Sequence, residues 1–511
     1  MAQASVPLDG SLTLADLEAV CLDGASVTLP EPTRDRVRAA RAAVDAILLR
    51  DESVYGVNTG FGALAQVRIA PEELEALQLN LVRSHAVGVG APFDVATTRA
   101  IMLLRAAVLS AGHSGTRLAV LERLVELLNL GIHPVIPQQG SVGASGDLAP
   151  LAHLALVLIG EGRVHGADGA PVPSGHVLAA AGLSPLTLQA KEGIALINGT
   201  QAMTGLGALA VSRARRLART ADAVASLTVE AKRGSRRPFD ARLHHLRPHP
   251  GQIATASNLF RLTEGGTIGA SHVDCGKVQD AYSLRCAPQV HGASRDSIEH
   301  VAAVLTRELN AVTDNPTLFP DTGEVISGGN FHGQPVAIAL DLLAMAVAEL
   351  GSVSERRIEQ LVNSHLSELP AFLVTESGVN SGFMMAQVTA AALVSENKGL
   401  CHPASVDSIP TSANQEDHVS MGPIAARKAM RVIEHAEMVL AIEALAAAQA
   451  VEFHLPLVPA DGAAAVHATV RSRVSRMDQD RELHGDLVAA AELVRSGAFI
   501  EAAEAAIGPL D

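Results

Sequence analysis

The sequence predicts a mainly α protein with a central bundle of long helices and a loop-rich N-terminal active-site region. Hydrophobic residues make up 48% of the 511-residue chain, but aromatic residues make up only 2%. Such a composition, dominated by Ala, Leu and Val, favours closely packed helices over sheets. Apolar positions also recur at helical spacing after residue 70, for example at Ile298, Val301, Leu305 and Leu309.

The expected helices are apolar around most of their circumference, so most must be buried on several sides. A bundle of this kind favours an oligomer in which partner subunits cover the remaining faces. Asn315-Pro316 ends one helix, and Pro335 opens another that runs to about residue 350, with a further helix from about residue 352. Other helices are expected over residues 102–130, 205–227, 384–396 and 425–451.

Loop density and charge divide the chain into three consecutive parts. Residues 1–200 form a loop-rich N-terminal region, residues 201–455 the long-helix bundle, and residues 456–511 peripheral C-terminal helices of higher charge. The stretch around residues 231–252 is polar, and we expect it to be a mobile excursion from the bundle.

Charge and cysteine usage exclude several classes of protein. The 54 acidic and 39 basic residues give a net charge of −15, and no basic face for nucleic acid is visible. The four cysteines show no C-x-x-C spacing, which indicates reduced thiols. The N-terminus lacks a signal peptide, and charges such as Asp341 interrupt the apolar stretches. We therefore expect a cytoplasmic protein without a membrane or nucleic-acid partner.

Two weaker patterns have simple structural explanations. Gly205 and Gly207 imitate a dinucleotide-binding motif, but no strand precedes them, so helix packing is expected. His244, His245 and His249 could hold a metal, but a solvated surface loop is the better interpretation, and we predict no metal site.

Seven irregular segments rich in Gly, Asn, Gln and Ser separate the apolar helices. Loops of this kind are costly to order, so seven of them suggest that they meet at one place. They are VYGVNTGFGAL, SHAVGVGAP, GSVGASGDLAP, LINGTQ, VQDAYSLRCAPQVHG, ISGGNFHGQP and SIPTSANQEDHVSMG.

The segment GASGD, with Ala144, Ser145 and Gly146 at its centre, allows two chemistries. It nearly spells the nucleophile elbow of a serine hydrolase, but the strand that such an elbow needs is not predicted. Alternatively, the amide nitrogen of Gly146 could close a five-membered ring on the carbonyl carbon of Ala144, because only glycine leaves that nitrogen unhindered. Loss of water from Ser145 would then leave a methylene group conjugated to the ring, which is a strong electrophile.

Together, GASGDLAPLAHLAL, LINGTQAM, VQDAYSLRC, GGNFHGQP and TSANQEDHVSMG resemble the aromatic amino acid ammonia-lyases. The resemblance runs from about Thr13 to at least Leu455. It implies autocatalytic formation of 4-methylidene-imidazol-5-one from Ala144, Ser145 and Gly146, with Ser145 becoming 2,3-didehydroalanine, and no dissociable cofactor. It also implies a mostly helical homotetramer in which the active sites draw on several subunits.

Both tyrosines of the chain, Tyr55 and Tyr282, fall in these irregular loops. A phenol can act as a base when neighbours lower its pKa, whereas a structural tyrosine would more often lie in a helix. The resemblance makes Tyr55 the base for the β-proton and places Tyr282 beside the prosthetic group. The alternative for each is a buried phenol with a satisfied hydroxyl.

Four further residues match substrate-binding positions of the family. Arg285 stands in an otherwise uncharged stretch and matches the residue that binds the substrate carboxylate with its guanidinium fork. Asn198 and Gln279 match residues that hold the substrate or polarise the ring carbonyl, and Phe331 matches one beside the ring. Without the resemblance, each would be interpreted as a loop amide or a core aromatic residue.

His85 and Glu416 select the substrate. A carboxylate accepts the N–H of an imidazole, and a histidine supplies or accepts the complementary hydrogen bond. The pair resembles the family members that act on histidine, which implies conversion of L-histidine to trans-urocanate and ammonia, the first step of histidine degradation. Glu416 could also take the β-proton in place of Tyr55. Alternatives are a phenylalanine or tyrosine ammonia-lyase, an aminomutase of the same family, or a catalytically dead helical scaffold.

Overall fold

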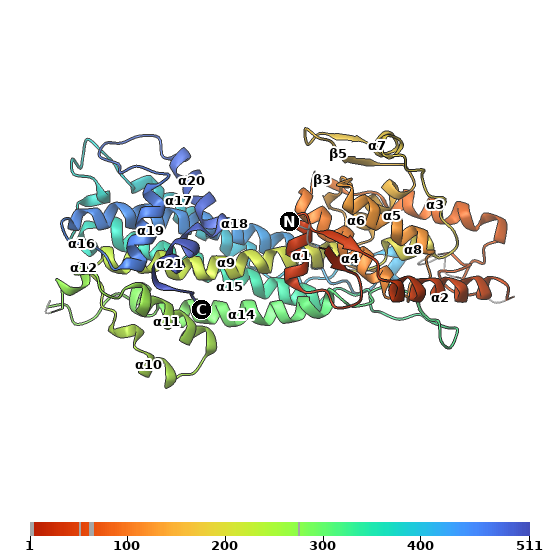
Figure 1. Ribbon diagram of the computed structural model, residues 1–511, viewed down its shortest axis with the longest axis horizontal. Coiled ribbons are helices and arrows are strands. Elements are labelled where there is room, and N and C mark those ends of the chain that lie inside the picture. The colour runs from red at the N-terminus through yellow and green to blue at the C-terminus, as the bar shows by residue number, and fades with distance from the viewer. Residues whose placement is uncertain (1–4, 51–52, 61–65, 274–275) are drawn as a thin grey trace. The chain divides into compact units, whose positions relative to one another are not determined.

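The computed structural model describes residues 5–50, 53–60, 66–273 and 276–511 (Figure 1). Within these residues the protein is mainly α, and strands occur only in four two-stranded sheets, which confirms the predicted fold class. The chain forms two compact units. Unit 1 comprises the residues up to Leu209 together with Ala302–Asp341 and Pro403–Arg427, and unit 2 comprises Ala210–Val301, Leu342–His402 and Lys428–Asp511. Both units are discontinuous in sequence, and the division into three consecutive parts stays a prediction.

Unit 1 contains the small sheets and the shorter helices of the N-terminal half. β1 and β2 pair in parallel, with Val6 opposite Val27, and the other three sheets are antiparallel. The strands are β1 (Ser5–Pro7), β2 (Ser26–Thr28), β3 (Val89–Pro92), β4 (Pro137–Gln139), β5 (Arg163–His165), β6 (Pro171–Pro173), β7 (Thr317–Phe319) and β8 (Glu324–Ile326). The helices are α1 (Leu14–Cys21), α2 (Glu31–Leu48), η2 (Pro71–Glu73), α3 (Leu74–His85), α4 (Val95–Ser110), α5 (Leu118–Asn129), α6 (Leu148–Leu158), α7 (Ser174–Ala180), α8 (Glu192–Ile197) and η5 (Ser412–Asn414).

Over the residues that the structure describes, unit 2 consists of helices joined by loops and contains none of the strands β1 to β8. Its short helices include three that follow residue 456. They are η3 (Arg237–Phe239), α10 (Ala241–His245), α11 (Pro250–Leu262), α12 (Thr267–Ala270), α13 (Tyr282–Arg285), α16 (Ser364–Ser367), η4 (Ala371–Leu373), α17 (Met384–Leu400), η6 (Glu452–His454), α19 (Asp461–Arg471), α20 (His484–Ser496) and α21 (Ala498–Ile507).

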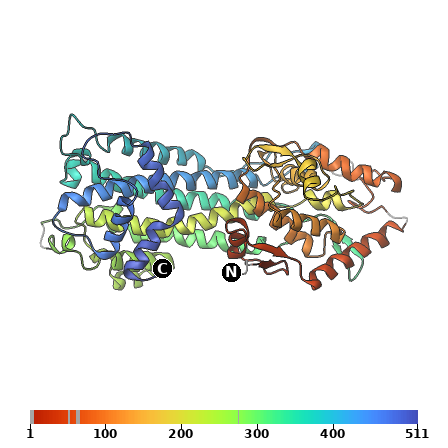
Figure 2. The ribbon, with the colours of Figure 1, turned by 45° about the horizontal axis from the view of Figure 1, so that its top comes forward.

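Four long helices contribute residues to both units: α9 (Gln201–Ala231), α14 (Ala287–Glu308), α15 (Gln334–Val362) and α18 (Gly422–Val451). Within unit 2 they run side by side in both ribbon views (Figures 1 and 2), and buried polar contacts join them. Glu443 on α18 accepts hydrogen bonds from Thr228 on α9 at 2.7 Å and from Arg357 on α15 at 2.5 and 2.8 Å. The predicted helical bundle is therefore present in unit 2.

Three predicted helix boundaries are wrong. The helix expected to end at Asn315-Pro316 ends earlier, because α14 stops at Glu308. The segment 102–130 is not one helix, because α4 ends at Ser110 and α5 begins at Leu118. Gly112 and Gly115 between them have φ of +77° and +74°, a left-handed backbone that interrupts the helix. Conversely, α15 continues through residue 352 without a break.

The Gly205–Gly207 segment lies inside α9 and serves helix packing, as predicted. A Cβ atom on Gly205 would lie 3.1 Å from Cβ of Ala100 on α4, and one on Gly207 would lie 2.8 Å from Cδ2 of Leu340 on α15. Glycine at both positions lets the neighbouring helices of unit 1 approach closely.

The helix α15 is long and apolar enough to pass a length-and-composition test for a membrane span. However, 67% of its most apolar 18-residue window is buried inside the protein, as in the core helix of a folded domain.

The polar stretch near residue 244 is more ordered than the sequence suggests. His244 is 1% exposed, and its ring nitrogens contact the carbonyl oxygen of Pro238 at 2.9 Å and Nε2 of Gln252 at 3.0 Å. The expectation of a solvated loop is therefore wrong for His244. Among the described residues, no group of three or more His, Cys, Asp or Glu side chains is placed to hold a metal ion.

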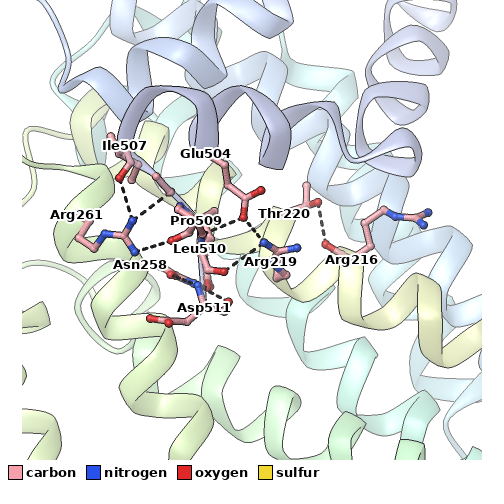
Figure 3. A network of polar contacts seen from close by, with 12 residues as sticks. Arg216, Arg219, Thr220, Asn258, Arg261, Glu504, Ile507, Pro509, Leu510 and Asp511 are labelled. Atoms are coloured by element: carbon pink, nitrogen blue, oxygen red, sulfur yellow. Dashed lines mark hydrogen bonds and ion pairs between the residues drawn. The ribbon is translucent and has the colours of Figure 1, made fainter. Parts of the chain in front are cut away.

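The C-terminal residues are bound to unit 2 through their backbone (Figure 3). Arg261 on α11 donates to the carbonyl oxygens of Ile507, Gly508 and Pro509 at 2.8 to 3.1 Å. Asn258 on the same helix accepts from the amide of Asp511 at 2.9 Å. These contacts fix the segment that follows α21 against α11.

Candidate active site

Six of the seven irregular loops bring side chains to one cavity in unit 1, with a volume of about 900 Å³. The seventh, VQDAYSLRCAPQVHG, contributes none of the described lining residues. The lining consists of Ser53, Tyr55, Thr59, Gln66, Leu81, His85, Ala144, Ser145, Leu148, Ile194, Asn198, Asn315, Ser327, Gly328, Phe331, His332, Ser412, Gln415, Glu416, Asp417 and His418. Of the first predicted loop, residues 61–64 lie outside the described residues.

The Ala144–Ser145–Gly146 segment forms a tight bend at the edge of this cavity. Gly146 has a φ of +75°, and a Cβ atom there would lie 2.2 Å from the carbonyl oxygen of Gly199. Glycine is therefore required at this position by both backbone conformation and space. Ser141 helps to hold the bend, since its hydroxyl donates to the carbonyl oxygen of Gly146 at 3.1 Å.

Ser145 is oriented by a carboxylate, which argues against the serine-hydrolase alternative. Its hydroxyl donates to Oε1 of Glu416 at 3.0 Å, and no hydrogen bond to a histidine is found within the described residues. Moreover, the short strand β4 ends at Gln139 and does not lead directly into the bend. A nucleophile elbow needs a strand, a sharp turn and a base beside the serine.

Asn198 connects the bend to the end of α8. Its side chain is 3% exposed, and its Nδ2 donates to the carbonyl oxygen of Ser145 at 3.1 Å. Its Oδ1 is buried and has no hydrogen-bond partner within the described residues. A buried amide oxygen without a partner is costly, so this acceptor is available to a bound molecule.

His85 and Glu416 both line the cavity. Nδ1 of His85 lies 2.8 Å from the carbonyl oxygen of Leu81, which accepts the Nδ1 proton and leaves the Nε2 lone pair as an acceptor. Burial lowers the pKa of His85, opposed by the Leu81 carbonyl and by the charge of Glu416, so the ring is neutral at pH 7. The second carboxylate oxygen of Glu416 accepts from the hydroxyl of Thr411 at 2.6 Å.

Tyr55 and Phe331 also reach the cavity, as the sequence predicts. Gln279, Tyr282 and Arg285 do not line it, and all three belong to unit 2. Tyr282 is 69% exposed, and the guanidinium carbon of Arg285 lies 4.5 Å from the centre of its ring. These two side chains therefore form a cation–π pair on α13 in which the tyrosine is exposed and the arginine is half-buried.

Three residues of the site were not predicted, although all lie in the quoted motifs. Asp147 is 0% exposed, and its Oδ2 accepts from the amides of Ala202 and Met203 at the start of α9 at 2.8 and 2.9 Å. Burial raises the pKa of this carboxyl to about 7. The rings of His332 and His418 stack at the cavity with centroids 5.6 Å apart.

Residues 12–472 match the family model described as aromatic amino acid lyase. The chain belongs to the aromatic amino acid lyase family. Curated relatives include the histidine ammonia-lyase of Sorangium cellulosum, which is 58% identical over 98% of this chain and 99% of the relative, and that of Anaeromyxobacter sp. strain K, 57% identical over 96% and 98%. The predicted family is confirmed, and the chain is accordingly a lyase.

Solved structures agree with this family. The histidine ammonia-lyase of Trypanosoma cruzi superposes with a TM-score of 0.91 at 47% identity, covering 98% of this chain and 96% of that one. Tyrosine aminomutase from Streptomyces globisporus gives a TM-score of 0.94 at 41% identity over 99% and 100%. The same fold therefore carries more than one reaction within the family.

Proposed function

We propose that this lyase is a histidine ammonia-lyase, which eliminates ammonia from L-histidine to give trans-urocanate. The observation that carries the proposal is that the bend with Ser145 shares one cavity with His85 and Glu416. The near-full-length relatives with this name support it. The first step of histidine degradation and a cytoplasmic location belong to the same proposal.

The residues of the bend fit the methylidene-imidazolone group. Gly146 has no side chain and a left-handed backbone, and Asn198 donates to the carbonyl oxygen of Ser145 that would become the ring carbonyl. Ring closure would join the nitrogen of Gly146 to the carbonyl carbon of Ala144 and release that carbonyl oxygen with the amide protons of Ser145 and Gly146 as water. Ser145 would lose its hydroxyl and α-proton as a second water. When formed, the group supplies an electrophile for the amine or the imidazole of the substrate, and either choice stays open.

The chain's own residues then bind and orient the substrate. The carboxylate of Glu416 and the Nε2 lone pair of His85 are both acceptors. Either can accept the N–H of a neutral imidazole ring, and together they suit the two N–H groups of an imidazolium ring. Positioning of this kind would bring the β-proton to a base in the cavity wall. Tyr55 and Glu416 are the two candidates for that base, and both remain open.

The substrate carboxylate needs a cationic partner in the cavity. Its described lining contains Glu416 and Asp417 but no Lys or Arg. We propose that Arg285, with Gln279 and Tyr282, is supplied by a second copy in a homotetramer. The exposure of Tyr282 and its contact with Arg285 support this assignment, because the tyrosine is accessible to another subunit and the guanidinium lies beside it.

The test combines intact mass with turnover. The wild-type chain should weigh two water molecules less than its sequence and should convert histidine faster than phenylalanine or tyrosine. Ser145→Ala should fold and assemble but lose most activity, because it cannot form the methylene group. Ser297→Ala is the control, since among the described residues the hydroxyl of Ser297 hydrogen-bonds only to the carbonyl oxygen of Ala293 on α14.

Three outcomes would defeat parts of the proposal. Near-normal turnover by Ser145→Ala would exclude the mechanism. A wild-type chain with unmodified mass and no turnover would favour the dead helical scaffold. Preference for phenylalanine or tyrosine, or formation of a β-amino acid, would favour a different ammonia-lyase or an aminomutase, an alternative motivated by the similarity to tyrosine aminomutase.

A further inference from the structure

Arg105 on α4 is a fully buried cation beside the candidate site, although it does not line the cavity. Its side chain is 0% exposed, and its Nη1 donates to the backbone carbonyl oxygen of Asn198 at 2.6 Å. Nε and Nη2 donate to no acceptor within the described residues. Burying a guanidinium with so few partners is costly, so its retention calls for a compensating role.

The charge of Arg105 is only partly balanced. The negative charge that acts on it is that of Asp314. One oxygen of Asp314 already accepts from Nζ of Lys191 at 3.2 Å, and the other accepts from the amide of Asn315 at 2.7 Å. Two buried cations, Arg105 and Lys191, thus share one carboxylate. Burial lowers the pKa of Arg105 to about 10, opposed by Asp314, and the group is still charged at neutral pH.

The backbone of Asn198 is held on both sides. Arg105 binds its carbonyl oxygen, and the next carbonyl, that of Gly199, accepts from the amide of Asp147 at 2.6 Å. A Cβ atom on Gly199 would lie 3.1 Å from Nη1 of Arg105, so the guanidinium packs closely against this turn. The side-chain amide of Asn198, which is attached to this fixed backbone, donates to the carbonyl oxygen of Ser145.

We infer that Arg105 is a positioning residue that holds the Asn198 amide against the carbonyl oxygen of Ser145. This inference rests on the proposed function, in which that oxygen becomes the ring carbonyl. A well-placed donor there draws electrons from the conjugated ring and makes its methylene carbon more electrophilic. Arg105 therefore contributes to the chemical step through Asn198 and not through contact with the substrate.

The test compares Arg105→Met and Arg105→Lys with Lys191→Met as a matched control. Lys191→Met also removes a buried cation beside Asp314, but within the described residues Lys191 makes no hydrogen bond to Asn198. The variants are compared by kcat and KM for histidine per matured chain, with the matured fraction read from the loss of two waters. Matured chains are also treated with borohydride. Its hydride adds to the methylidene carbon and the solvent supplies a proton, so the chain gains two hydrogens. Mass spectrometry then gives the rate of this addition.

Arg105→Met should lower kcat about 10- to 100-fold, the range for loss of a hydrogen bond to a charged group, with KM changed less than about threefold. Its rate of hydride addition should fall in parallel. Arg105→Lys should retain more of both rates than the Met variant, because an ammonium can still donate to the carbonyl. Lys191→Met should keep both rates within about threefold of the wild type.

The inference is overturned if matured Arg105→Met has wild-type kcat and hydride rate, or if Lys191→Met loses as much as Arg105→Met. It is also overturned if Arg105→Met folds but never loses the two waters, since Arg105 would then serve maturation instead of turnover. Should Arg105→Met not fold, Arg105→Lys decides: unchanged kcat and hydride rate overturn the inference, and a decrease in both supports it. Failure of the proposed function is distinct, because it appears as a wild-type chain of unmodified mass or without histidine turnover.

Discussion

Replacing Gly146 by Ala should block maturation and destabilise unit 1. The substitution adds a single methyl group at a bend where φ is +75°. That methyl carbon would lie 2.2 Å from the carbonyl oxygen of Gly199 and 2.5 Å from its carbonyl carbon, closer than real Cβ contacts are found. The clash is with backbone, so no side-chain rotation relieves it.

The expected loss of stability has two contributions. A left-handed backbone costs an L-residue about 1 to 2 kcal/mol. Moving Gly199 away would also break the 2.6 Å hydrogen bond from the amide of Asp147, worth about 0.5 to 1.5 kcal/mol. We therefore expect a decrease of about 1.5 to 3.5 kcal/mol in the free energy of unfolding, together with loss of the bend that brings Gly146 to Ala144.

Gly182→Ala is the matched control. Gly182 has nearly the same φ, +72°, but no atom lies within 4 Å of the added Cβ position. It should cost only the conformational part, about 1 to 2 kcal/mol, and should mature normally. Urea denaturation of both variants gives the stabilities, and intact mass gives the matured fraction.

A Gly146→Ala chain that loses both waters, or one no less stable than Gly182→Ala, would refute this reasoning. The first result would mean that the bend tolerates a side chain during ring closure. The second would mean that the close approach of Gly199 carries no energetic weight.

Two other predictions concern buried charge. Glu443→Gln should lower the free energy of unfolding by about 3 to 5 kcal/mol, because it leaves the buried charge of Arg357 without its partner. Glu492→Gln, which removes one charge of an exposed ion pair, should lower it by less than about 1 kcal/mol. Equal shifts of the urea midpoint in the two variants would contradict this prediction. The pKa of Asp147 in the folded protein is raised to about 7. Between pH 4 and 7 this carboxyl group therefore binds more protons in the folded chain than in the unfolded chain, and its contribution to the free energy of unfolding decreases as the pH rises. The stability of Asp147→Asn relative to wild type should therefore increase over that interval, at up to about 1.4 kcal/mol per pH unit; parallel pH profiles would argue against a raised pKa.

The sequence predicts the long helices well because apolar periodicity is strongest where helices are buried. It overestimates the length of one helix by joining α4 and α5, because the apolar pattern continues across the interruption at Gly112 and Gly115. The structural reason for the break is tertiary: side chains at those glycines would meet Arg36 and Val44 of α2 at 2.9 and 2.5 Å. Contacts 70 or more residues away in the sequence leave no local signal.

For the candidate active site too, the sequence does not reveal contacts between residues that are far apart in the chain. Motif resemblance locates Ser145, Asn198 and Glu416, and the structure brings all three to one cavity. It gives no indication that Arg105 is buried, since an arginine in an apolar helix can equally reach solvent along its stem. The partners of a buried charge depend on the whole fold and are visible only in three dimensions.

The contacts of the bend also determine when its chemistry can occur during synthesis. The hydroxyl of Ser145 meets Glu416, 271 positions later, and the carbonyl oxygen of Gly143 accepts from Ser420. A nascent chain still lacking those residues cannot adopt this geometry on the ribosome. The reactive group would thus arise only after more than four fifths of the polypeptide has been translated, when the surrounding walls can shield it from cellular thiols.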